Sequence, residues 1–157
     1  MELIDIVDEK DNVIDSMPRE KAHRKGLLHR GAAIIALDEE SNFVIQKRAK
    51  DKTVKPGKLC IPGGHLESGD SYREGAVREL FEELYSQENG ETSLEELFKI
   101  RKESDNDPEF MKVFLAEVTS PFNPQESEVD RLLFWNKEKL IKEVKESPEK
   151  FTGTTVR

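Results

Sequence analysis

Apolar and polar residues alternate along several short stretches of the chain, as they do in half-buried strands. Residues 2–8 (ELIDIVD) show this pattern first, and Val13–Met17 follow after a polar turn as a second predicted strand. Gly31–Leu37 (GAAIIAL) is a continuous apolar run that indicates a buried strand, and Phe43–Arg48 is predicted to return beside it as an antiparallel hairpin. Further strands are predicted at Leu59–Ile61, Leu97–Glu103, Phe110–Val118 and Leu132–Trp135, the middle two as a second hairpin.

Helical spacing replaces this alternation in three places. Pro18 opens a polar helical piece that Gly26 ends, and Asp70 or Ser71 is placed to cap a helix running to about Tyr85. A third helix is predicted at Lys137–Lys145. Strands mixed with a few helices indicate an α/β (α+β) fold.

Composition narrows the class of protein. The 157 residues, 35% of them hydrophobic, fit a single domain over 1–157 with a real core. A formal net charge of -8 makes a duplex nucleic acid or a membrane surface a poor partner. The chain has one cysteine, Cys60, and no apolar run of about 18 residues. We therefore expect a soluble cytoplasmic protein without a disulfide.

The predicted helix ahead of Tyr85 carries two different faces. At about 100° per residue, Glu79, Glu82 and Glu83 share one side. Neighbouring like charges repel by roughly 0.2–0.5 kcal/mol per pair, and a divalent cation such as Mg²⁺ or Mn²⁺ would reverse that penalty. Such a cluster taken alone is typical of a solvated helix face. The opposite side is apolar and suited to packing on a sheet, with Ala76, Val77, Leu80 and Leu84.

The context of the three glutamates favours chemistry over a solvated face. Gly63 and Gly64 permit a tight turn just before the helix and a close approach of backbone to phosphate or metal. Arg78 follows Glu74 by four residues, which permits an ion pair within the helix, and it also stands beside the carboxylates that it could orient.

The segment Gly64–Ser86 (GHLESGDSYREGAVRELFEELYS) resembles the Nudix box. Gly64 fills the first glycine of that pattern, Arg78-Glu79-Leu80 fills its Arg-Glu-aliphatic triplet, and Glu82-Glu83 fills its acidic pair, all at the family's spacing. Three positions depart from it: Asp70 stands where Glu is usual, Tyr85 replaces a glycine, and Ser86 replaces an aliphatic residue. Because a bulky Tyr85 would be strained at positive φ, the helix is expected to end differently here.

The resemblance implies a Nudix-like α/β/α sandwich with a central mixed sheet. It also implies metal ligands: Glu79 and Glu83 first, Glu82 next, and the carbonyl of Gly63. A further carboxylate often comes from a later loop in this family, where Glu128 is preferred and Glu126 is the other candidate.

The implied reaction is attack of water, activated by the bound cations, on a phosphorus of a nucleoside diphosphate derivative or related small diphosphate. Glu82 or Glu128 would be the general base, and the sequence does not choose between them. Arg78 would support the carboxylates. Arg48, Lys58 and the backbone of Gly64 would face the substrate, and Lys55 is a weaker candidate.

Two other functions stay open. The N-terminal stretch, with its Arg-Glu, His23 and His29-Arg30, resembles the branch of the family that includes isopentenyl-diphosphate isomerase. That enzyme carries an essential cysteine in a Cys-Gly-His segment, where this chain has Gly63, and Cys60 is expected to be a buried hydrophobe. A non-catalytic binding module is the second alternative, although such modules usually lose the helix carboxylates.

Several properties are not fixed by the sequence. No pattern specifies the group attached to the diphosphate. His23 and His29 are expected to be structural or exposed rather than catalytic. A homodimer is expected only by analogy with similar proteins. Four aromatic residues could stack on a substrate but are expected in the core, namely Phe110, Phe122, Phe134 and Trp135.

Overall fold

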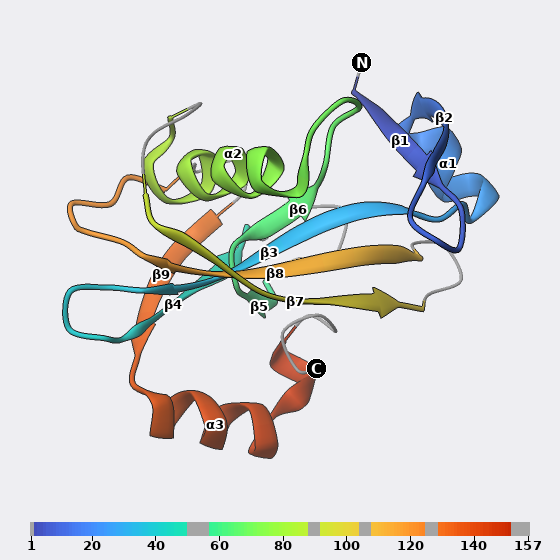
Figure 1. Ribbon diagram of the computed structural model, residues 1–157. Helices are drawn as coiled ribbons and strands as arrows, with labels where there is room; N and C mark the ends of the chain where they lie inside the picture. Colours follow the sequence, from blue (N-terminus) through green and yellow to red (C-terminus); the bar gives the residue numbers. More distant parts are fainter. Residues whose placement is uncertain (1, 50–56, 88–91, 104–107, 125–128, 152–157) are drawn as a thin grey trace.

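The structure is a computed structural model that describes residues 2–49, 57–87, 92–103, 108–124 and 129–151. Within these ranges, nine strands form one mixed sheet, with helices on both of its faces (Figure 1). The strands are β1 (Leu3–Val7), β2 (Val13–Pro18), β3 (His29–Leu37), β4 (Phe43–Arg48), β5 (Leu59–Cys60), β6 (Gly63–His65), β7 (Leu94–Lys102), β8 (Glu109–Glu117) and β9 (Val129–Trp135). The helices are α1 (Arg19–Lys25), α2 (Tyr72–Tyr85) and α3 (Lys137–Glu146), followed by the 3₁₀ turn η1 (Pro148–Lys150).

Strand β3 is the centre of the sheet. Along one edge it pairs in parallel with β8 over its whole length, from His29 opposite Glu109 to Leu37 opposite Glu117. Its other edge is shared in succession by β1, β6 and β4, all antiparallel to it. Strand β9 then extends the sheet beyond β4, and β7 extends it beyond β8. This arrangement brings the short strand β6 into the middle of the sheet.

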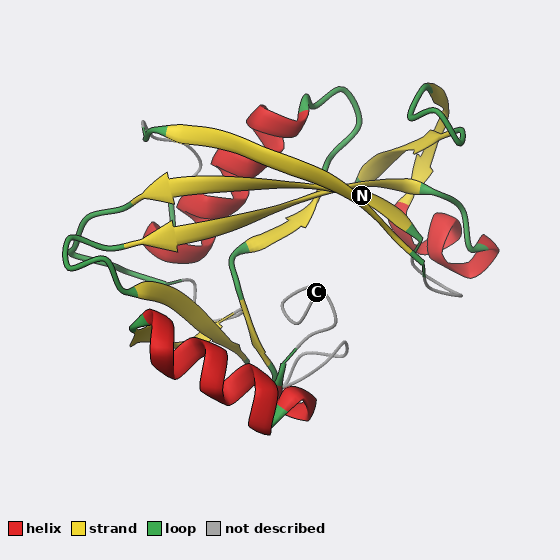
Figure 2. Cartoon of the chain, turned by 60° about the horizontal axis from the view of Figure 1, so that its bottom comes forward, coloured by secondary structure: helices red, strands yellow, loops and turns green. Residues whose placement is uncertain are grey.

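Apolar residues cover both faces of the sheet, so the predicted α/β/α sandwich is confirmed. Helix α2 buries Ala76, Leu80 and Leu84 against β3 and β8, as its predicted apolar face requires. Helix α3 lies on the opposite face, where Leu140 and Val144 pack beside β4, β5 and β9 (Figure 2). None of the described helices is long and apolar enough to cross a membrane.

The strand after Gly31 pairs differently from the prediction. Strands β3 and β4 do form an antiparallel hairpin, but their only registered pair is Leu37 opposite Phe43. Beyond that point β3 pairs with β6 along the same edge, and β4 pairs with β5, while β9 occupies the other edge of β4. The hairpin therefore ends after one pair, because β6 and β5 take the two edges that a longer hairpin would use. The second predicted hairpin, β7 with β8, is confirmed.

Gly63 and Gly64 do not make the predicted tight turn. They form strand β6 with His65, opposite Ala33, Ala32 and Gly31 of β3. A Cβ atom on Gly63 would lie 2.3 Å from the carbonyl oxygen of Ala32, so only glycine fits at this distance from β3. The actual turn comes later, at Gly69, whose φ is +90°. Glycine here serves close packing of two strands rather than chain reversal.

Candidate active site

Helix α2 is started by a capping box. The hydroxyl oxygen of Ser71 accepts a hydrogen bond from the Glu74 N–H, and the Glu74 carboxylate accepts one from the Ser71 N–H. These bonds satisfy exposed donors at the first turn and fix the rotation at which the helix begins. Ser71 rather than Asp70 is thus the N-cap. Because the rotation is fixed here, it sets which side chains point at the sheet two turns later.

Two of the predicted ligands point at β6. The Oε2 atom of Glu83 accepts a 2.8 Å hydrogen bond from the Gly63 N–H, and Glu83 is only 7% exposed. Glu79 lies against the next residue, because a Cβ on Gly64 would meet its carboxyl carbon at 2.8 Å. The two glycines therefore lie directly against the two carboxylates. The acidic group is not the solvated helix face that the bare pattern suggests.

Arg78 lies beside these carboxylates, as predicted, but with a different main partner. Its guanidinium bonds Asp70 and lies 3.7 Å from both Glu67 and Glu79. The ion pair with Glu74 that the spacing permits is not used, because the Glu74 carboxylate is held in the capping box. Burial acts to lower the pKa of Arg78, but the hydrogen bond with Asp70 and the negative charges of Asp70, Glu67 and Glu79 together outweigh it, so the pKa is raised. Arg78 remains a cation that links the loop before α2 to Glu79.

The structure describes only some of the remaining candidate residues. Glu82 is half-buried on α2, one residue before Glu83. Glu126, Glu128 and Lys55 lie outside the described residues, so their predicted roles stay predictions.

The basic candidates lie at the end of β4. The Arg48 N–H donates to the Lys58 carbonyl at 2.8 Å, which closes the loop between β4 and β5. The Lys58 ammonium donates to the carbonyl of Glu149, next to α3. Burial raises the pKa of the Cys60 thiol to about 11; the nearby Glu83 charge adds to this shift and Arg48 opposes it. Arg48 and Glu83 thus both act on one buried thiol, and Cys60 is a buried small residue as predicted.

The end of α2 explains two departures from the box. Tyr85 is the last helical residue, and the left-handed position falls on Ser86, with φ of 54°. The Tyr85 hydroxyl donates to the Thr119 carbonyl at 2.8 Å and accepts from the Thr119 N–H at 3.2 Å. Its ring stacks on Phe81 and lies 5.5 Å from Phe122. Tyr85 therefore holds the loop after β8 and escapes the strain expected at positive φ. Of the aromatic candidates, Phe122 packs on the core but Phe134 is 43% exposed.

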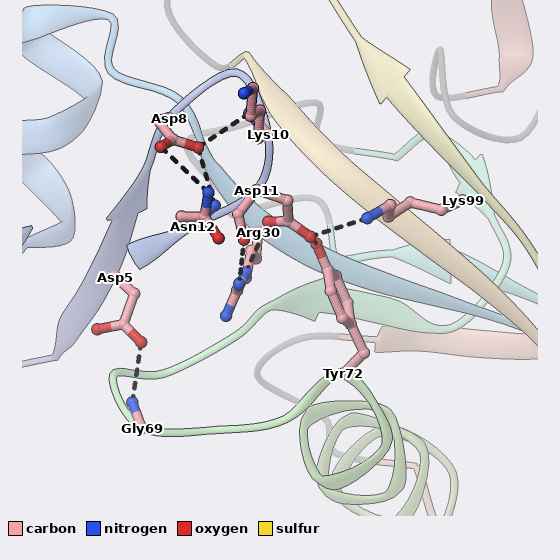
Figure 3. Close-up of polar contacts among 9 residues, drawn as sticks. All are labelled: Asp5, Asp8, Lys10, Asp11, Asn12, Arg30, Gly69, Tyr72 and Lys99. Carbon is pink, nitrogen blue, oxygen red and sulfur yellow. Dashed lines mark hydrogen bonds and ion pairs between the residues drawn. The ribbon is translucent and has the colours of Figure 1, made fainter. Parts of the chain in front are cut away.

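The N-terminal strands hold the start of α2 in place. Asp11, at the turn between β1 and β2, accepts hydrogen bonds from Arg30, Tyr72 and Lys99 (Figure 3). The three distances are 2.8, 2.7 and 3.0 Å. Burial acts to raise the pKa of Asp11, but these donors outweigh it and the pKa is lowered. Asp5 also receives a 3.1 Å hydrogen bond from the Gly69 N–H in the loop that leads into α2. These contacts connect strands β1 and β2 to the loop before α2 and to the first turn of that helix.

A second group of metal-binding side chains lies nearby. Ligand nitrogens of His23, His29 and His65 come within 4.8 Å of one another. The buried Glu109 joins them, with its Oε2 atom 3.3 Å from His65 Nδ1 and 3.6 Å from His29 Nε2. His29 Nδ1 lies 2.9 Å from the Leu27 carbonyl, which holds a proton on Nδ1 and turns Nε2 to the group. Imidazoles with one carboxylate suit a transition metal such as Zn²⁺ or Mn²⁺.

The sequence carries only a weak signal for this histidine group. It predicts that His23 and His29 are structural or exposed, and each is separated from His65 and Glu109 along the chain. The helix α1, the strand β6 and the parallel pair β3–β8 bring them together. The available signal was the resemblance of the His23 and His29 region to the isomerase branch. His29 is fully buried, so it is not exposed.

The carboxylates of α2 fit a hard divalent cation. Glu79 and Glu83, the half-buried Glu82 and the backbone oxygens of β6 make a donor set of oxygen atoms, which Mg²⁺ prefers. The absence of a side chain at Gly64 lets the Glu79 carboxylate lie against the backbone of β6, and the absence of one at Gly63 lets β6 lie against β3. The histidine group offers nitrogen donors and is chemically distinct.

Comparison with known proteins identifies the family. The family model described as NUDIX domain matches residues 27–153. This chain belongs to the NUDIX domain family. An uncharacterized Nudix hydrolase of Pseudomonas aeruginosa is 30% identical over 148 residues, which cover 94% of this chain and 86% of that protein. Another, from Yersinia pestis, is 40% identical over 85 residues, and the match spans only 47% of its length.

The other matches show the breadth of the NUDIX family. An isopentenyl-diphosphate Delta-isomerase of Cereibacter sphaeroides is 35% identical over 150 residues, which cover 87% of this chain and 80% of that enzyme. Among solved structures, the DR0079 protein of Deinococcus radiodurans aligns with a TM-score of 0.76 at 20% identity, covering 93% of this chain and 90% of that one. The structural match shows a shared fold. The named relatives include both hydrolases and isomerases of the NUDIX family.

Proposed function

We propose that this NUDIX protein hydrolyses the diphosphate linkage of a nucleoside diphosphate derivative or related small diphosphate, with Mg²⁺ or Mn²⁺. The observation that carries the proposal is the contact of Glu79 and Glu83 with Gly64 and Gly63, which gathers the box carboxylates on one short strand. Oxygen donors packed in this way are typical of sites for divalent cations that bind phosphates. Metal bound there would polarise phosphoryl oxygens and lower the pKa of water.

Each residue then has a proposed role. Glu79 and Glu83 would hold the cation together with Glu82 and the Gly63 carbonyl. Arg78 would position Glu79, which lies 3.7 Å from it. Glu82 or Glu128 would take the proton from water.

The substrate would meet the basic end of β4. Arg48 lies there, and its charge and that of Glu83 both act on the buried Cys60 thiol. Arg48 and the backbone of Gly64 would bind its phosphates, since a guanidinium and backbone N–H groups suit phosphate oxygens. Lys58 is the weaker candidate, because its ammonium contacts the Glu149 carbonyl instead.

The direct test is a substrate panel. Purified protein is incubated with nucleoside diphosphate derivatives and small alcohol diphosphates, with Mg²⁺, with Mn²⁺ and with a chelator. We expect at least one compound to release a phosphate-containing product only when a divalent cation is present. If no diphosphate is cleaved with any divalent cation, the hydrolase proposal is wrong and a binding module becomes the better interpretation.

An isomerase is the second candidate, because several relatives at 35–36% identity carry that name. Two observations oppose it. A cysteine cannot replace Gly63 here, since its Cβ would clash with the Ala32 carbonyl at 2.3 Å. The thiol of Cys60 is buried, and burial raises its pKa to about 11, so it is a poor proton donor or nucleophile near neutral pH.

Isopentenyl diphosphate distinguishes the two reactions. Proton NMR follows movement of its double bond, and a phosphate assay follows hydrolysis in the same sample. We expect the double bond to stay in place, and Cys60→Ala to leave hydrolysis of the best panel substrate unchanged. Double-bond movement that Cys60→Ala abolishes would establish the isomerase instead.

A further inference from the structure

The outer strand β7 has the properties of a self-association surface. In the described part of the chain it pairs only with β8, so it forms one edge of the sheet (Figure 1). It is nine residues long and contains no proline. Leu97 and Phe98 are 40% and 50% exposed on it. A long edge strand with exposed apolar residues is a template for pairing with another strand.

The charged residues of β7 are arranged so that a second, antiparallel copy of the strand would complement them. Glu95 and Glu96 stand near its beginning, and Lys99, Arg101 and Lys102 stand near its end. In an antiparallel pair of two identical strands, the acidic start of one copy lies beside the basic end of the other. The strand is therefore its own electrostatic complement, which favours a second copy of this chain over a different peptide.

A bulge in β7 makes this pairing geometrically consistent. The register with β8 shifts between Glu96 and Phe98, so Leu97 is an extra residue. Glu96 then lies opposite Phe114 and Arg101 opposite Phe110, and these two phenylalanines are on one face of β8. Without the bulge, Glu96 and Arg101 would point to opposite faces. With it, they point to the same face.

We propose that two copies of this chain associate through β7, antiparallel, about a two-fold axis at Lys99. With Leu97 skipped as the bulged residue, Glu96 of each copy lies opposite Arg101 of the second copy. Phe98 lies opposite Ile100 on the other face. The two Lys99 residues face each other, and each ammonium is already 3.0 Å from Asp11 of its own chain. The two sheets become one continuous sheet.

The existing partners of these charges are compatible with the pairing. Glu96 lies 2.7 Å from Lys112, and its side chain is still 54% exposed. Arg101 pairs with Glu9 of its own chain and lies 2.6 Å from Glu103, and its side chain is still 35% exposed. Both groups can therefore gain a further partner without being uncovered first.

Strand β2, at the opposite edge of the sheet, lacks this complementary pattern of charges. Val13 and Ile14 are also exposed there, at 51% and 63%. Its residues VIDSMP include Asp15 and no cation, and it ends at Pro18. Two copies of β2 would therefore gain no pair of opposite charges. Ile14 therefore supplies a matched control site.

The test is sedimentation of the full chain over a range of about 1–500 µM, since a single strand pair is a small interface and its affinity is expected near the micromolar range. We expect a concentration-dependent dimer. Charge reversal in Glu96→Lys, or separately in Arg101→Glu, should weaken it by at least about tenfold. Ile14→Lys should leave it unchanged, and circular dichroism checks that each variant is folded.

Mixing the two charge variants gives the decisive result. In a mixture, Lys at position 96 of one chain meets Glu at position 101 of the other, and the second pair keeps its natural charges. We expect the mixture to dimerise more tightly than either variant alone. A wild-type chain that stays monomeric overturns the proposal, as does a dimer that Glu96→Lys leaves intact or that Ile14→Lys abolishes.

Discussion

The backbone N–H of Gly63 donates a 2.8 Å hydrogen bond to the Oε2 atom of Glu83. This bond joins the middle of the sheet to the last turn of α2, and it orients a carboxylate that is 7% exposed. A buried carboxylate held by a backbone donor is fixed in direction before any ligand arrives. The geometry of the proposed cation site therefore depends on β6 as much as on the helix.

Replacing Glu83 should impair hydrolysis. Glu83→Gln keeps the size of the side chain but removes the charge that would bind the cation, so we expect activity to fall by at least about tenfold. The exposed Glu138→Gln on α3 is the matched control and should retain full activity. Initial rates at several Mg²⁺ concentrations measure the effect. Equal rates for Glu83→Gln and wild type would remove Glu83 from the site.

A side chain at Gly64 should displace Glu79. In Gly64→Ala the new Cβ would lie 2.8 Å from the Glu79 carboxyl carbon. We expect the Mg²⁺ concentration for half-maximal rate to rise by about tenfold, because one charged ligand is moved. Gly69→Ala is the control: its φ is +90° and nothing lies within 4 Å, so it should lower stability but not the Mg²⁺ dependence. A similar Mg²⁺ dependence in both variants would contradict the proposed contact.

Removing the Asp11 charge should change how the free energy of unfolding depends on pH. The pKa of Asp11 is lowered in the folded chain, from an ordinary value of 3.8. The stabilisation that the charged Asp11 gives to the folded chain is thus fully present above a pH of 3.8, and it is lost as the pH falls through the lower pKa of the folded state. Asp11→Asn should cost about 1–3 kcal/mol at neutral pH and less in strong acid. Urea unfolding at several pH values measures this, with the exposed Asp130→Asn as the control. A constant difference across pH would argue against a charged Asp11.

Restoring the family's glycine at position 85 should be harmful here. Tyr85→Gly loses the ring contacts with Phe81 and Phe122 and the bonds to Thr119, and it places glycine inside a helix. We expect a loss of about 2–4 kcal/mol, below that of a fully buried aromatic residue. Tyr85→Phe should cost only about 1 kcal/mol, since it removes the hydroxyl alone. Thermal unfolding checks the order, and a more stable Tyr85→Gly protein would contradict it.

The histidine group should bind a transition metal separately from the α2 carboxylates. We expect equilibrium dialysis to find a site for Zn²⁺ or Mn²⁺ that His23→Gln weakens by at least about tenfold. Glu83→Gln should leave that site intact. Binding should weaken in acid, because an imidazole nitrogen must be free of its proton to bind metal. Equal weakening by the two substitutions would mean that the groups form one site.

The sequence by itself determined the parts of this protein that depend on near neighbours. The spacing of Ala76, Leu80 and Leu84 fixed the buried face of α2, and the interval from Gly64 to Glu83 indicated the family. Ser71 with Glu74 fixed where the helix begins. These features were predictable because helix rotation, capping and strand alternation act over only a few residues.

The tertiary structure decided what depends on pairing between distant segments. Gly63–His65 is a strand because β6 shares one edge of β3 with β1 and β4. That strand turns the Gly63 N–H toward Glu83. His23, His29, His65 and Glu109 meet because α1, β6 and β8 converge on β3, and Asp11 finds three donors from other elements. Such contacts have no local signal, since their energy comes from side chains whose separation is set by the register of the whole sheet.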